Sequence, residues 1–178
     1  MKSSKVAKRY ARALAGLSTD PAQLEAWGVE LERLAQLVGA PEVAAQLASP
    51  EVSPSARIRA LTVIGERLGL SFPLRSFGAV VARHGRIEDL PAIAEAYRRI
   101  LDDLMGRVRP TITFARSPYD AELAQVLAGL EAIAHKKIIP TVRVDAALLG
   151  GVVVELEGKT YDGSLATRLA EAQRRLAG

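Results

Sequence analysis

The chain has 178 residues, of which 49% are hydrophobic and only 4% are aromatic. This length allows one medium domain or two small ones, with a core built from Ala, Leu, Val and Ile. The absence of cysteine excludes disulfides and the commonest structural zinc sites. No metal site is expected, because the two histidines, His84 and His135, stand far apart in the sequence. A net charge of +4 permits contact with nucleic acid or anionic lipid without requiring it, and no apolar run is long enough to span a bilayer.

The first 106 residues predict helices only. Apolar residues recur there at three- and four-residue spacing, in segments bounded by capping residues, prolines or glycines. Phe77, Val80 and Val81 are expected on one face of the fifth helix. We expect a six-helix bundle over residues 1–106, with helices at Val6–Leu17, Pro21–Gly39, Pro41–Leu47, Pro54–Gly69, Phe72–Gly85 and Leu90–Arg107.

The pattern changes to strand periodicity after Arg107, which predicts a small α/β domain over residues 107–178. Apolar and polar residues alternate from Arg107 to Ala115, with Pro110 placing that strand at an edge or near its own beginning. A helix after Pro118 and a strand over Ile139–Val144 follow. The predicted order closes with a strand at Val152–Val154 buried on both faces, a hairpin turn at Glu157-Gly158, a strand at Lys159–Tyr161 and a helix capped by Ser164. The fold class is therefore mainly α with a small α/β part.

Two chemical alternatives are weighed against a purely structural role. Gly158-Lys159-Thr160 suggests a phosphate-binding loop, but the motif needs a second glycine where Val153 stands. No nucleophile paired with a base, no metal-binding motif and no complete nucleotide-binding motif is present, so neither a catalytic residue nor a cofactor is predicted. These absences favour an interaction module over an enzyme.

The N-terminal segment is strongly basic. Lys2, Lys5, Lys8, Arg9 and Arg12 precede the first acidic residue. The segment therefore has the charge of a transit peptide, but we interpret it as part of the mature protein. A basic helical protein that binds nucleic acid remains the alternative function, which a steep salt dependence of binding would support.

Three groups of residues resemble landmarks of the delta subunit of F-type ATP synthases, the family of the mitochondrial oligomycin sensitivity conferral protein. The segment from Val6 to Leu14 is similar to the family's opening Ala-x-x-Tyr-Ala-x-Ala-Leu. His84-Gly85-Arg86 with Leu90-Pro91 resembles its central landmarks. The C-terminal signature is matched by Gly150, Gly151, Asp162, Gly163, Ser164, Arg168 and Leu169, which we expect to serve the fold rather than a contact.

The resemblance implies a non-catalytic stator subunit. It would hold the N-terminal helices of the alpha subunits through its helical bundle, and the C-terminal end of the b subunit through its second domain. The partner-binding groove would use Val6, Tyr10, Ala13, Leu14, Phe77, Val80 and Val81. One copy would lie at the cytoplasmic face of a bacterial plasma membrane, without nucleic acid and without direct insertion into the membrane.

Overall fold

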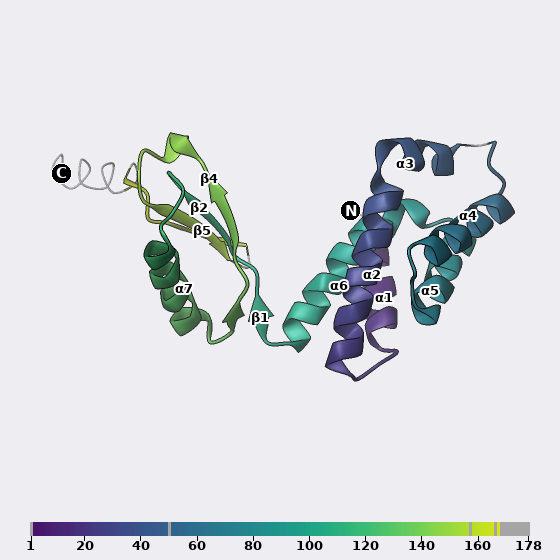
Figure 1. Cartoon of the computed structure of the whole chain (residues 1–178), viewed down its shortest axis with the longest axis horizontal. Helices are drawn as coiled ribbons and strands as arrows, with labels where there is room; N and C mark the ends of the chain where they lie inside the picture. The colour runs from purple at the N-terminus through teal and green to yellow at the C-terminus, as the bar shows by residue number, and fades with distance from the viewer. Residues whose placement is uncertain (1, 50, 157, 166, 168–178) are drawn as a thin grey trace. The chain divides into compact units, whose positions relative to one another are not determined.

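The computed structural model describes residues 2–49, 51–156, 158–165 and 167, with side chains from Lys5 onward. The chain forms two compact units, Met1–Met105 and Gly106–Gly178, which Figure 1 shows as a helical part and an α/β part. No helix in the described ranges is long and apolar enough to cross a membrane. Each unit has a hydrophobic core of its own, so each is described separately.

The helical unit contains the six predicted helices. Asp20 begins the second of them by accepting the Ala22 N–H at 3.0 Å, and Ser53 begins the fourth by accepting the Ala56 N–H at 3.2 Å, as the capping residues predict. Proline at the first or second position of each, where its missing N–H is no loss, fixes both starts. The helices are α1 (Lys2–Ala15), α2 (Pro21–Gly39), α3 (Pro41–Ala48), α4 (Pro54–Arg67), α5 (Phe72–Arg83) and α6 (Leu90–Leu104), with a 3-10 turn, η1 (Ile87–Asp89), before α6.

Helix α6 lies against both α1 and α2, while α4 and α5 form a second pair (Figure 1). Helices α1, α2 and α6 share one core. Each contributes a side chain with at most 1% of its surface exposed: Leu14, Leu34 and Ile93. Tyr97 of α6 is also 1% exposed, and its hydroxyl donates to the Leu24 carbonyl of α2 at 2.9 Å. Burial raises the pKa of the Tyr97 hydroxyl to about 12, because the charged form would be poorly solvated.

Most helix ends differ by one to three residues from the sequence prediction: α3 ends at Ala48, α4 at Arg67 and α5 at Arg83, where Leu47, Gly69 and Gly85 were expected. Helix α1 ends at Ala15 rather than Leu17, and α6 ends at Leu104 rather than Arg107. Met105 is the C-cap residue of α6, and Gly106 follows with a φ of 58°. The backbone therefore leaves the helix before Arg107, which instead begins the first strand.

The α/β unit contains a four-stranded mixed sheet. Strand β2 (Thr111–Phe114) pairs in parallel with β4 (Thr141–Val144) and antiparallel with β5 (Val152–Leu156), which forms a hairpin with β6 (Lys159–Asp162). Helix α7 (Asp120–Ala134) connects the two parallel strands, as their crossover requires. A short 3-10 turn, η2 (Ala146–Leu148), precedes β5, and the strand order is β4-β2-β5-β6.

Prolines separate β1 (Arg107–Val108) from β2 and β3 (Lys137–Ile138) from β4 along the two parallel segments. Strand β1 pairs with β3 before the prolines, and β2 pairs with β4 after them. Pro110 has no N–H to donate to the neighbouring strand, while its carbonyl still accepts the Thr141 N–H at 2.9 Å. Pro110 stands directly before β2, which is an interior strand of the sheet. Of the two predicted positions, the start of the strand is therefore the one observed, and not an edge. Strand β3 begins at Lys137, two residues before the strand predicted from Ile139.

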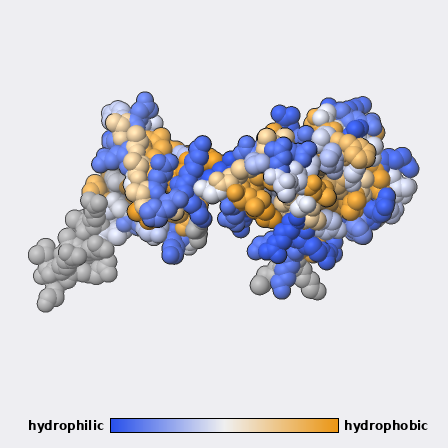
Figure 2. Space-filling view, turned by 90° about the horizontal axis from the view of Figure 1, so that it is seen from below, coloured by the Kyte–Doolittle hydropathy of each residue, from blue (hydrophilic) through white to orange (hydrophobic). Residues whose placement is uncertain are grey.

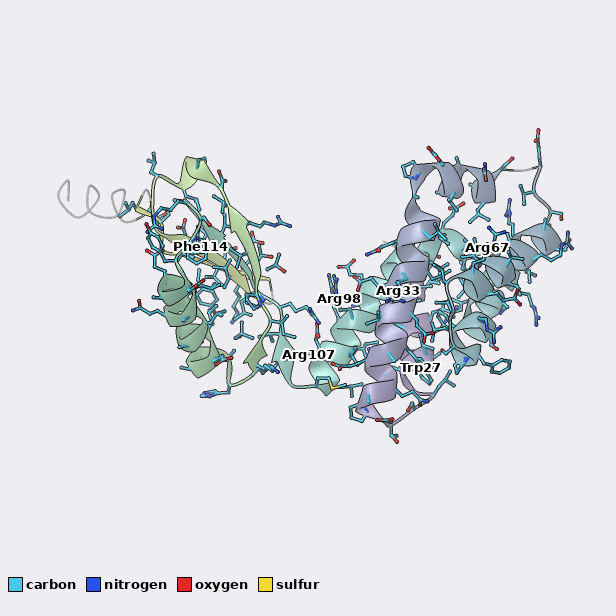
Figure 3. All side chains as sticks on the ribbon, in the orientation of Figure 1. Trp27, Arg33, Arg67, Arg98, Arg107 and Phe114 are labelled. Carbon is cyan, nitrogen blue, oxygen red and sulfur yellow. The ribbon has the colours of Figure 1, made fainter. Side chains whose placement is uncertain are left out.

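One face of the sheet is covered by α7 and the other is polar. Ile112, Phe114 and Val154 pack with Leu130 of α7, and Phe114 is seen between the helix and the sheet in Figure 3. Thr111, Thr113 and Glu155 alternate with these buried residues and therefore occupy the opposite face. The prediction that Val152–Val154 is buried on both faces is wrong: Val154 is buried, Val152 and Val153 are only partly so, and Glu155 is exposed.

Candidate partner-binding groove

Helices α1 and α5 meet at an aromatic contact. The ring centroids of Tyr10 and Phe77 are 6.3 Å apart, with an angle of 79° between the ring planes. This edge-to-face arrangement is a favourable one for two aromatic rings. The guanidinium of Arg9 lies 5.8 Å from the centroid of the Tyr10 ring. The contact brings together two segments that the sequence analysis joined in one groove.

The seven predicted groove residues do not share one environment. Leu14 and Val81 are completely buried and Phe77 is 9% exposed, so these three belong to the core beneath the surface. Val80 is 41% exposed, although it lies three positions after Phe77 and so on the same side of α5. Ala13 is also exposed, while Val6 and Tyr10 are partly buried. Phe77 and Val81 therefore belong to the core, whereas Val80 lies at the exposed border of the same side of α5.

Leu17 is an apolar surface residue that the predicted groove leaves out. Its side chain is 64% exposed, and its N–H donates to the Leu14 carbonyl at 3.1 Å, which continues the turn that follows α1. Tyr10, Ala13 and Leu17 are separated by three and four positions, the spacing of residues on one side of a helix. This spacing is the signal in the sequence that could have identified Leu17.

Helix α5 is held at its start by a residue of α2. Glu30 accepts hydrogen bonds from both the backbone N–H and the hydroxyl of Ser71, each at 2.8 Å. Ser71 is the N-cap residue of α5, but its own side chain caps nothing. The carboxylate of Glu30 thus supplies the negative charge that a helix N-terminus favours and fixes α5 relative to α2.

The C-terminal signature residues build a tight corner in the α/β unit. A Cβ atom at Gly151 would lie 2.5 Å from the Gly163 carbonyl oxygen, and the φ of Gly151 is 85°. A Cβ atom at Gly150 would lie 2.5 Å from a methyl group of Leu165. The Leu165 N–H donates to the Gly150 carbonyl at 2.9 Å. Both glycines therefore allow the two segments to approach more closely than side chains would permit.

Asp162 and Ser164 complete this corner. The carboxylate of Asp162 accepts the Ser164 N–H at 2.9 Å and the Thr167 hydroxyl at 2.7 Å. These bonds to its charged form lower the pKa of Asp162, the Ser164 N–H being the larger cause. The Ser164 hydroxyl accepts the Thr167 N–H at 3.3 Å, which confirms Ser164 as a helix cap. Arg168 and Leu169 lie outside the described residues.

Both units also expose apolar side chains. Figure 2 shows orange patches interrupted by blue on each of them. In the helical unit these side chains include Leu17 and Val80. In the α/β unit, Val144 is 56% exposed, Ile133 is 66% exposed and Tyr161 is 46% exposed. Within the described residues, no group of His, Cys, Asp and Glu side chains is arranged to hold a metal ion. The surface features that the structure offers are thus apolar patches and grooves on both units.

Comparison with known proteins places this chain among the subunits of ATP synthases. Proteins named ATP synthase subunit delta are similar to it along nearly their whole length. The relative from Citrifermentans bemidjiense is 31% identical over 97% of both chains, that from Geobacter metallireducens is 33% identical over 97% of both, and that from Anaeromyxobacter dehalogenans is 34% identical over 96% of both. The solved structure of the Toxoplasma gondii mitochondrial ATP synthase hexamer contains a chain of similar fold, with a TM-score of 0.70, 18% identity and 97% of each chain covered.

The chain belongs to the ATP synthase delta (OSCP) subunit family, whose model matches residues 6–176. It is therefore a peripheral-stalk component of an ATP synthase, as the resemblance of its sequence landmarks implies. The alternative of a nucleic-acid-binding protein has no support in these comparisons.

Proposed function

We propose that this chain is a non-catalytic clamp that links the alpha subunits of the catalytic head to the b subunit, so that proton translocation stays coupled to ATP synthesis. The helical unit binds an N-terminal helix of an alpha subunit in the groove between α1 and α5. One copy serves each complex, peripherally, at the cytoplasmic face of a bacterial plasma membrane. In this proposal the domain of residues 1–106 binds the catalytic head, and the domain of residues 107–178 binds the stalk.

The observation that carries this proposal is the apolar surface beside the contact between Tyr10 and Phe77. Val80, three residues after Phe77, exposes 41% of its surface. On the α1 side, Ala13 is exposed three residues after Tyr10, and Leu17 exposes 64% four residues later. An amphipathic helix could cover these side chains with its own apolar face. Leu14, Phe77 and Val81 would support the floor from below, while Val6 and Tyr10 line its α1 wall.

The α/β unit is the proposed binding site for the b subunit. Its exposed Ile133, Val144 and Tyr161 offer apolar area that its own core does not use. The signature residues Gly150, Gly151, Asp162, Gly163 and Ser164 have roles in the corner described above, and we propose that they act through the fold rather than by touching the partner. The same structural role is proposed for Arg168 and Leu169.

The groove is tested by placing charge on its exposed residues. Ala13→Asp combined with Val80→Asp should weaken binding of a peptide from the alpha N-terminus at least tenfold in calorimetry, because both carboxylates would be buried under the partner helix. Val63→Asp is the matched control, since Val63 of α4 is similarly exposed, by 47%. Unchanged binding by the double variant, with its helix content intact, would show that this groove is not the site.

A further inference from the structure

A second groove lies between α1 and α6. It is a hollow of about 300 Å³ whose lining includes Ala7, Ala92, Ala96 and Ile100. Ala7 is 1% exposed and forms part of the core, while the other three are partly buried. The floor of this hollow is therefore apolar and shallow, and nothing among the described residues covers it.

This groove is separate from the one between α1 and α5. On α1, Tyr10 faces α5 through its contact with Phe77, whereas Lys8 and Arg12 line the hollow beside α6. Residues 8 and 12 lie about 160–200° around the helix from residue 10, at about 100° per residue. Helix α1 thus has this hollow on one side and the groove proposed for the alpha subunit on the other, and the hollow contains none of the residues proposed for that groove.

The two walls of the second groove differ in charge. Helix α1 contains basic residues and no acidic one, and Lys8 and Arg12 have no acidic partner among the described side chains. On the α6 wall, Arg99 forms an ion pair with Glu95. Asp103 of the same wall is exposed and has no ion-pair partner among the described residues. The groove therefore has positively charged side chains, Lys8 and Arg12, along α1 and one negative side chain without a described partner, Asp103, on α6.

We propose that the groove between α1 and α6 binds an amphipathic helix of another polypeptide, one with small apolar residues on its inner face, acidic residues along the border that meets α1, and a basic residue on the border that meets α6. The alanines of the floor allow the backbone of such a helix to approach closely. The acidic border pairs with Lys8 and Arg12, and this complementary charge sets the orientation of the bound helix.

The proposal is tested on the full chain with a designed helical peptide of about 18 residues, which carries Ala and Leu on one face, Glu on one border and Lys on the other. Fluorescence anisotropy at low ionic strength should detect saturable binding. Lys8→Glu combined with Arg12→Glu should weaken it about tenfold, since two rim attractions become repulsions. A peptide with Lys and Glu exchanged should bind this double variant better than it binds the unaltered chain.

The matched control is Arg33→Glu combined with Arg67→Glu, which changes the net charge equally. Both side chains are exposed on other helices, α2 and α4 (Figure 3), and this variant should bind as the unaltered chain does. The proposal is overturned by an absence of binding to the unaltered chain, by equal loss in the two double variants, or by failure of the exchanged peptide to restore binding. Anionic vesicles that displace the peptide would assign the basic border to lipid and would also overturn it.

This test is independent of the alpha-subunit groove. Ala13→Asp with Val80→Asp leaves Lys8, Arg12 and the α6 wall unchanged, so it should not affect the designed peptide. Conversely, the reversal of Lys8 and Arg12 should affect the designed peptide more than it affects an alpha N-terminal peptide bound between α1 and α5. Failure of one groove assignment is therefore distinguishable from failure of the other.

Discussion

The hydroxyl of Tyr97 is a polar group that makes its hydrogen bond inside the helical core. It donates to the Leu24 carbonyl at 2.9 Å from a side chain that is 1% exposed. The Leu24 carbonyl also accepts an N–H within α2, so the Tyr97 hydroxyl uses its second lone pair and adds a modest net free energy. The bond therefore links α6 to the start of α2 within the core that the two helices share.

Tyr97→Phe should lower the free energy of unfolding by about 0.5–1.5 kcal/mol, because it removes the hydrogen bond between α6 and the Leu24 carbonyl, which keeps only its helical N–H partner. The unaltered chain should also lose stability as the pH rises above the ordinary tyrosine pKa, since the unfolded chain releases the phenolic proton there while the folded one holds it up to a pKa of about 12. The variant should lack this contribution to the alkaline loss. Denaturant titrations at neutral and alkaline pH measure both effects, with Tyr161→Phe at an exposed tyrosine as the control. A variant as stable as the unaltered chain would contradict the assignment.

At the scale of the elements, the close approach of two segments at Gly151 and Gly163 determines the corner of the α/β unit. The Gly163 N–H donates to the Val152 carbonyl at 2.9 Å, which ties the end of the hairpin to the start of β5. A side chain at position 151 would meet backbone atoms, which cannot rotate away as a side chain could. The constraint is thus steric as well as conformational.

Gly151→Ala should destabilise the α/β unit by about 2–4 kcal/mol, which combines the strain of a positive φ with overpacking against the Gly163 carbonyl. Gly158→Ala is the matched control, because Gly158 has a similar φ of 81° but no atom within 4 Å of the added carbon. That control should cost only about 1–2 kcal/mol. Thermal unfolding of the two variants compares them, and equal losses would show that close approach contributes nothing.

The starts of the elements were largely predictable from the sequence, whereas their tertiary partners were not. Asp20 and Ser53 cap their own helices through neighbours two or three residues away, which a local pattern can reveal. Ser71 is also a serine at a helix start, but its hydroxyl donates to the carboxylate of Glu30, 41 positions earlier in the chain. No local sequence pattern contains that information. The strand breaks could have been predicted, since Pro110 is visible in the sequence and its missing N–H has a definite consequence.

The candidate groove was predictable in its helices but not in its surface. A three- and four-residue period identifies the apolar side of α1 and α5, yet it does not separate core residues from surface ones. Leu14 and Val81 are fully buried, while Val80 and Leu17 are exposed. Whether an apolar residue is buried or exposed depends on how much of the helix surface the neighbouring helices cover. That coverage is set by the tertiary packing of the unit and not by the periodicity of one helix.

For the whole molecule, the two hydrophobic cores share no residue. One is built from residues between Ala7 and Leu101 and the other from residues between Val108 and Leu156. Each core excludes water from its own elements and is bounded by the division at Met105 and Gly106. Loss of one core therefore does not by itself remove contacts from the other.

Calorimetry of the full chain should show two unfolding transitions. Tyr97→Phe should lower only one midpoint and Gly151→Ala only the other, each by about 4–8 °C for every kcal/mol lost in a unit of this size. The assignment follows from the separate cores that the two residues serve. A single transition, or a common shift of both midpoints by either variant, would show that the units unfold together.

The position of Pro140 has a consequence for self-association. The N–H groups of β3 and β4 that bond to the neighbouring strands come from odd positions, among them Lys137, Ile139 and Thr141, so position 140 faces the outer edge of the ladder. In the described part of the chain β4 ends the sheet, and its Val142 and Val144 are exposed. An incoming strand from another molecule would meet a missing donor just before these valines, so Pro140 protects the edge against edge-to-edge aggregation.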